Sequence, residues 1–300
     1  MWMASFTKLM TSVCAMQLVE QGKVALDEPV YKHIPELASL PILTGIDEST
    51  GKPIEEENTT PITLRHLLTH TSGITYDILH PFTVAWLKYH KMPGGASGKL
   101  LERFAAPLIF APGTGWAYGP STDYAGLLVE RVSGKRLEAY MQEHLWAPLG
   151  IKEASFHPSI RADLQGRLAD MGARTPDGRL THFEGPFPWA DGEGKEMEGD
   201  HGGHGSFSTA EEYGKFVHAV LTSDENERLL KKSTVEELFK PQLGEESRAA
   251  LNAVLQIDWV CARFLLLNTD LMIVLGQQHH GWNAEVYDER LGLRWIIDDE

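Results

Sequence analysis

The apolar pattern of residues 5–21 predicts a helix with hydrophobic side chains on nearly every face, ended by Gly22. A helix of this kind belongs at the centre of a core. Its first turn nevertheless holds Ser5 and Lys8, which lie three residues apart and therefore on one face. Two interpretations are open: an N-cap serine followed by a solvated lysine, or a nucleophile beside its base.

The rest of the pattern predicts short helices first and strands only near the end of the chain. Helices are expected over 63–68, 123–132, 137–145, 209–221 and 233–239, with Thr63 capping the first and Ser208 or Thr209 capping the fourth. Polar or glycine-rich loops are expected over 44–61 and 170–200, and strands over 271–275, 284–287 and 293–297. This order favours an α/β or α+β fold with a helical cluster beside a sheet.

Length and composition fit a globular protein. The 300 residues are 42% hydrophobic and 23% charged, and this length supports one large domain or two smaller ones; our prediction is a single domain over 1–300. Within it, residues 35–220 form a mainly helical and loop insert region, and 256–300 form C-terminal strands. The net charge of −15 disfavours nucleic acid and anionic membranes as partners.

The lack of recognisable targeting signals and the placement of the cysteines favour a cytoplasmic protein. The chain has neither an apolar run of about 18 residues nor a basic segment leading an apolar stretch. Cys14 and Cys261 lie far apart inside apolar patterns, as buried thiols do in a reducing compartment. Oligomeric state is open.

Tyr118 is a candidate for proton transfer. It stands between the Pro112-Gly113 turn and Gly119-Pro120, so its loop is conformationally restricted. A serine without a histidine partner needs another base, and Lys8 serves only where burial or neighbouring cations favour its neutral amine. A phenol in the same pocket can relay the proton. The alternative is an aromatic side chain packed beside Trp116.

An ordered set of motifs resembles the β-lactamase-related hydrolases. It includes the Ser-Phe-Thr-Lys run, the Leu-Arg-His-Leu-Leu-Thr-His-Thr-Ser-Gly stretch and the Gly-Gly-His-Gly stretch, within residues 3–8, 17–30, 62–73, 112–118, 148–151 and 202–209. That superfamily includes class C β-lactamases, D-alanyl-D-alanine carboxypeptidases, family VIII esterases and fungal lovastatin-type acyltransferases. The similarity covers roughly residues 1–245.

The resemblance implies a β-lactamase/penicillin-binding-protein-like fold: an antiparallel sheet flanked by helices, with a helical subdomain, incomplete at both ends of this chain. It implies an acyl-enzyme formed on Ser5, with Lys8 and Tyr118 moving the proton. The Ser5 backbone N–H would supply half of an oxyanion hole. No metal and no cofactor is expected, and the partners are a small-molecule acyl donor and acceptor.

Two departures from the superfamily pattern guide the functional prediction. The second motif is often Tyr-x-Asn, whereas Tyr118-Gly119-Pro120 is followed here by Ser121, which is similar to the esterase and fungal acyltransferase branch. The nearest match to the third motif contains His280 and Gly281. We expect these two residues, with Trp116 and Ser121, to bind substrate.

The predicted function is a serine acyltransferase or esterase acting on a small ester or thioester in fungal secondary metabolism. A catalytically inactive remnant of the fold is the alternative. A β-lactamase or D-alanyl-D-alanine carboxypeptidase is less favoured, because the asparagine after Tyr118 is missing and no export signal is seen.

The histidines suggest no metal site by their spacing. His66 and His70 are four residues apart, but the His-Glu-x-x-His pattern is missing. His201 and His204 lie on a glycine-rich stretch and are expected to meet solvent. The glycines around them, 202, 203 and 205, are expected to allow close backbone approach under a helix.

Overall fold

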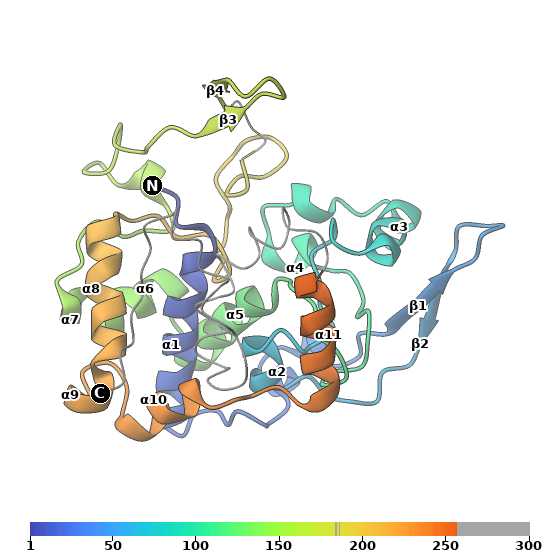
Figure 1. The fold of residues 1–300 in the computed structure, drawn as a ribbon, viewed down its shortest axis with the longest axis horizontal. Helices are drawn as coiled ribbons and strands as arrows, with labels where there is room; N and C mark the ends of the chain where they lie inside the picture. Colours follow the sequence, from blue (N-terminus) through green and yellow to red (C-terminus); the bar gives the residue numbers. More distant parts are fainter. Residues whose placement is uncertain (184, 186, 257–300) are drawn as a thin grey trace.

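Helix α1 (Thr7–Glu20) forms the centre of the hydrophobic core (Figure 1). The computed structural model describes residues 1–183, 185 and 187–256. Every residue from Thr7 to Leu18 is buried, because the helix is apolar on nearly all faces and is packed from several sides. A 3₁₀ turn, Ala4–Phe6, precedes it. The predicted central helix is therefore confirmed.

The helices around α1 are those that the sequence pattern predicted. Helix α5 (Ser121–Ser133) packs along α1, and α2 (Leu64–Leu68) and α6 (Leu137–Met141) pack against α5. Thr63 accepts a hydrogen bond from the His66 backbone N–H at 3.2 Å and so caps α2. Thr209 caps α8 (Ala210–Leu221) in the same way. Both predicted caps are confirmed.

The remaining elements surround this centre. They are α3 (Pro81–His90), α4 (Leu100–Arg103), α7 (Ala147–Leu149), α9 (Ser223–Asn226), α10 (Lys232–Phe239), α11 (Glu245–Gln256), β1 (Ile42–Ile46), β2 (Pro53–Glu56), β3 (Gly172–Arg174) and β4 (Leu180–His182). In Figure 1 the β1–β2 hairpin projects from one side of the molecule and the β3–β4 hairpin from the top. Helix α3 packs against the β1–β2 hairpin.

Two expected loops contain strands. The loop expected over 44–61 is wrong, because β1 and β2 pair antiparallel from Ile42 opposite Glu56 to Ile46 opposite Pro53. Strands β3 and β4 likewise pair inside the expected loop over 170–200. Strands β2, β3 and β4 are mostly exposed, and Leu43 is the one fully buried residue of β1, so the hairpins lack the apolar alternation that identifies a half-buried strand. Glu245 begins α11, where acidic side chains favour the first turn.

The three predicted late strands lie outside the described residues. The division into 35–220 and 256–300 therefore stays a prediction. Among the residues that the structure describes, no helix has the length and apolar character needed to cross a membrane.

Candidate active site

Three side chains meet at the start of α1. The Ser5 hydroxyl oxygen lies 2.6 Å from the Tyr118 phenol oxygen, a hydrogen bond in which either group can donate. The Lys8 amine donates to the same serine oxygen at 3.2 Å. The Lys8 nitrogen also lies 4.8 Å from the centre of the Tyr118 ring. A hydroxyl within hydrogen-bond reach of a phenol and an amine is the arrangement of an activated nucleophile.

The backbone on both sides of this contact is restricted. Ala4, the residue before Ser5, has φ +49°, a left-handed conformation that costs an L-residue about 1–2 kcal/mol. On the other side, a Cβ added at Gly119 would lie 2.4 Å from the Ile74 carbonyl oxygen. Only glycine lets the Tyr118 loop approach the 74–75 backbone this closely. These constraints hold the serine and the phenol in place before any substrate binds.

The Lys8 amine is held from behind by a buried relay. Lys8 is fully buried and donates to the Gly203 carbonyl at 2.7 Å. The Gly203 N–H in turn donates to Asp123 Oδ1 at 2.9 Å. Burial alone would raise the pKa of Asp123, but the facing histidines and Lys8 outweigh it and lower the pKa to about 2. An ionised Asp123 thus orients the peptide whose carbonyl binds the Lys8 amine.

No sequence motif assigned Asp123 or Gly203 to the site. A signal was present, because the expected close approach of the glycine-rich stretch is confirmed: Cβ atoms added at Gly202 and Gly203 would lie 3.0 Å from Thr11 and 2.1 Å from Asp123. The expectation that His201 and His204 meet solvent is wrong, since they are only 0% and 9% exposed. The loop that carries them packs closely between α1 and α5, because its glycines have no side chains to hold the backbones apart.

Aromatic rings cover the other face of Tyr118. The His70 ring centre lies 5.0 Å from that of Tyr118, and the Trp116 ring stacks on Tyr118 at 6.5 Å. Burial, with the Lys8 charge second, lowers the pKa of His70 to about 3, so this imidazole is neutral at physiological pH. His70 therefore adds no positive charge beside the Tyr118 phenol. The role of Trp116 in substrate binding stays a prediction.

The other expected substrate-binding residues differ in what the structure shows. Ser121 is fully buried, and its hydroxyl forms a hydrogen bond with the Ser72 hydroxyl at 2.8 Å. That contact ties the start of α5 to the Ser72 turn, and a direct contact with substrate stays a prediction. His280 and Gly281 lie outside the described residues.

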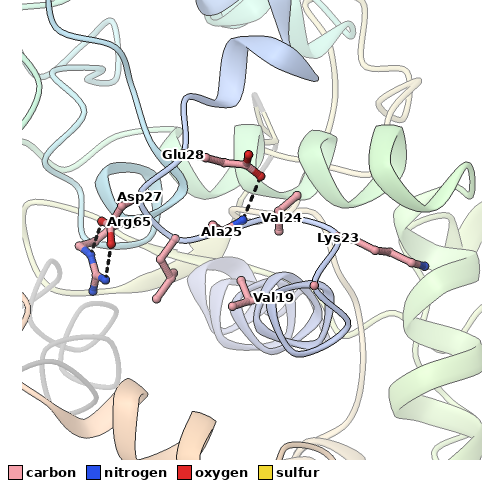
Figure 2. A pocket seen from close by; sticks show the side chains of 9 residues that line it. Val19, Lys23, Val24, Ala25, Asp27, Glu28 and Arg65 are labelled. Atoms are coloured by element: carbon pink, nitrogen blue, oxygen red, sulfur yellow. Dashed lines mark hydrogen bonds and ion pairs between the residues drawn. The ribbon is translucent and has the colours of Figure 1, made fainter.

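A separate hollow of about 510 Å³ lies at the opposite end of α1 (Figure 2). It is lined by Val19 and residues 22–28, with Arg65 at its edge. Arg65 is held by two hydrogen bonds to Asp27, at 2.7 and 2.9 Å. Because Ser5 precedes the first turn of α1 and Val19 lies in the last, most of the helix length, about 20 Å, separates this hollow from the catalytic contact.

Comparison with known proteins identifies the family. The sequence profile of the beta-lactamase family matches residues 1–263. The chain therefore belongs to the beta-lactamase family. The lovastatin esterase of Penicillium rubens is 36% identical over 315 residues, covering 99% of this chain and 76% of the esterase. The monacolin J acid methylbutanoyltransferase of Aspergillus terreus is 39% identical over 251 residues, covering 83% of this chain and 59% of that enzyme.

Solved structures show the same relationship. Unliganded simvastatin synthase from Aspergillus terreus, as the selenomethionyl derivative, superposes with a TM-score of 0.76 at 37% identity, over 85% of this chain and 61% of the synthase. The chain thus spans less than two thirds of the length of these acyltransferases. A penicillin-binding protein homologue from Pyrococcus abyssi, at 23% identity and TM-score 0.52, shares the fold. The β-lactamase/penicillin-binding-protein-like fold class is confirmed.

Proposed function

We propose that the chain is a serine acyltransferase or esterase that forms an acyl-enzyme on Ser5. The observation that carries this proposal is the convergence of the Tyr118 phenol, at 2.6 Å, and the Lys8 amine, at 3.2 Å, on one hydroxyl oxygen. Both groups are within the range for direct proton transfer. The family membership and the names of the relatives support the same chemistry.

The proposed acylation begins when the Ser5 oxygen attacks the carbonyl carbon of an ester or thioester. Its proton passes to Tyr118 or Lys8, whichever is unprotonated, and the carbonyl oxygen becomes an oxyanion. Collapse of the tetrahedral intermediate expels the alcohol or thiol, which takes up that proton. In the second half the same groups deprotonate the acceptor, which attacks the Ser5 ester and releases the serine.

The proposed substrates are small molecules of fungal secondary metabolism. The relatives are named for lovastatin and for monacolin J acid, on which the methylbutanoyltransferase acts. An ester or thioester donor and a water or alcohol acceptor fit both names. A cytoplasmic location is proposed with this function; the described cysteine, Cys14, is a buried free thiol, as expected in a reducing compartment.

A fluorophosphonate probe tests the nucleophile. The folded wild-type chain should be labelled at Ser5 and should turn over p-nitrophenyl esters. Ser5→Ala should lose both labelling and turnover, whereas Ser133→Ala, at the end of α5, should keep both. Folded protein that shows neither would instead favour the catalytically inactive remnant.

The fate of the acyl group is a separate measurement. An alcohol added to the acylated protein should give an ester product in competition with the free acid if the protein is an acyltransferase. Free acid alone at every alcohol concentration would identify an esterase. Efficient hydrolysis of nitrocefin would favour a β-lactamase.

A further inference from the structure

A second group of chemically active side chains lies behind the catalytic amine. Asp123, His201 and His204 each offer one ligand atom, and these atoms lie within 4.8 Å of one another. The Asp123 and His201 side chains are fully buried, and that of His204 is 11% exposed. Such a carboxylate and two imidazoles form a donor set typical of transition-metal sites.

These polar atoms lack partners in the part of the chain that the structure describes. Asp123 Oδ2, both ring nitrogens of His201 and Nδ1 of His204 are buried, and none forms a hydrogen bond of good geometry with a described residue. Unsatisfied buried polar atoms are rare in native proteins, so several in one cluster indicate a bound ligand, water or ion.

The spacing of the atoms distinguishes an ion from direct hydrogen bonding. The Nδ1 atoms of His204 and His201 lie 3.5 and 3.8 Å from Asp123 Oδ1. Both separations are too long for good hydrogen bonds. They are close to the separation of about 3.4 Å between two ligands of a tetrahedral Zn²⁺ ion with bonds of 2.0–2.1 Å.

A second cluster of possible ligands, Glu138, His157 and Asp200, has two carboxylates and one imidazole and gives the contrast. His157 Nε2 lies 2.8 Å from Asp200 Oδ1, and Arg136 donates to the same carboxylate at 2.6 Å. The Glu138 carboxylate accepts from the Ser155 hydroxyl and from the Phe156 N–H. In this second cluster the Arg136 guanidinium already supplies the positive charge, and the carboxylate and imidazole atoms that could bind a metal already form hydrogen bonds. The Asp123 cluster has no such cation within hydrogen-bond distance among the described residues.

We propose that Asp123, His201 and His204 bind one divalent cation of the zinc type. Two imidazoles and one carboxylate favour Zn²⁺ over Mg²⁺ or Ca²⁺, which prefer oxygen ligands alone. Asp123 Oδ1, the oxygen that lies 3.5 and 3.8 Å from the two imidazoles, would bind the ion with one lone pair while the other accepts the Gly203 N–H.

The bound ion would brace the site without taking part in the chemistry. Asp123 and the 201–204 stretch would be joined through the ion, and this stretch carries the carbonyl that binds Lys8. The partly exposed edge of His204 gives the ion a route from solvent. The site is therefore structural, and binding can be measured without any turnover.

The experiment uses the full chain stripped with a chelator and then titrated with Zn²⁺ or Co²⁺. We expect one ion per chain, a Kd below about 1 µM, the visible absorption of a tetrahedral Co²⁺ centre, and a rise in Tm of roughly 5 °C at saturating Zn²⁺. His201→Ala and His204→Ala should each weaken binding about 100-fold. His182→Ala, at an exposed histidine that ends β4, and His157→Ala, in the cluster whose ligand atoms already form hydrogen bonds, should bind as wild type does.

Circular dichroism of each metal-free variant checks that it is folded. If an alanine variant fails to fold, His204→Gln replaces it. The Co²⁺ spectrum of the wild type tests for a tetrahedral metal centre without the need for any variant. Wild-type binding weaker than about 100 µM, or binding unchanged in both folded ligand variants, overturns the proposal. If the wild type binds the metal but does not turn over esters, the proposed function is contradicted and the metal site is not.

Discussion

Gly203→Ala should disable the site by moving the group that holds the catalytic amine. The added Cβ would lie 2.1 Å from Asp123 Oδ2 and 2.7 Å from its Cγ. Ordinary contacts need about 3.5 Å, so the Gly203 peptide or the Asp123 carboxylate must move by more than about 1 Å. The Gly203 carbonyl binds Lys8, whose nitrogen is already 3.2 Å from the Ser5 oxygen. A shift of this size therefore separates the base from the nucleophile.

The size of the expected loss in acylation rate follows from this displacement. A misplacement of about 1 Å in a catalytic arrangement costs on the order of 100-fold in rate, or about 2.7 kcal/mol of barrier. Overpacking of the buried contact adds a loss of about 1–3 kcal/mol in the free energy of unfolding. We therefore expect the acylation rate to fall about 100-fold while the chain still folds.

The assay is the single-turnover rate of acylation with a p-nitrophenyl ester, read beside Tm and circular dichroism. Gly214→Ala is the matched control, because a Cβ there meets no atom within 4 Å and the residue lies inside helix α8. That variant should keep its rate and gain about 0.5–1 kcal/mol in stability. A folded Gly203→Ala protein that acylates within about threefold of the wild type would refute the relay from Asp123 to Lys8.

Three further predictions concern the phenol and the buried Asp200. Tyr118→Phe should keep the fold and lower kcat by about 10²–10⁴-fold, measured on the same ester. Gly119→Ala places a Cβ 2.4 Å from the Ile74 carbonyl oxygen, so it should lower both Tm and kcat, and an unchanged kcat would contradict the predicted displacement of Tyr118. Burial alone would raise the pKa of Asp200, but its bonds to His157 and an arginine outweigh that effect and lower the pKa to about 2. Its stabilisation is therefore complete above the unfolded pKa and is lost as the pH falls. Urea unfolding should show the difference between wild type and Asp200→Asn narrowing by about 1 kcal/mol from pH 6 to pH 3.

Much of the catalytic contact could be predicted from local sequence. The burial of α1 follows from apolar residues on all its faces, and the caps at Thr63 and Thr209 follow from their position before helical patterns. Ser5 and Lys8 are three residues apart in one helical turn, so helix geometry alone places them together. Tyr118 was identified by its motif, and the structure brings it within hydrogen-bond distance of Ser5 across 113 residues of chain.

Only the tertiary structure placed the groups behind Lys8. Gly203 lies 195 residues from Lys8 and 80 from Asp123, and no local pattern relates positions so far apart. The burial of His201 and the exposed β1–β2 pairing likewise depend on which surfaces pack or pair, rather than on periodicity. Sequence periodicity determines the faces of each element, because side-chain direction repeats with the backbone. The partners of those faces are decided by the free energy of packing the whole chain.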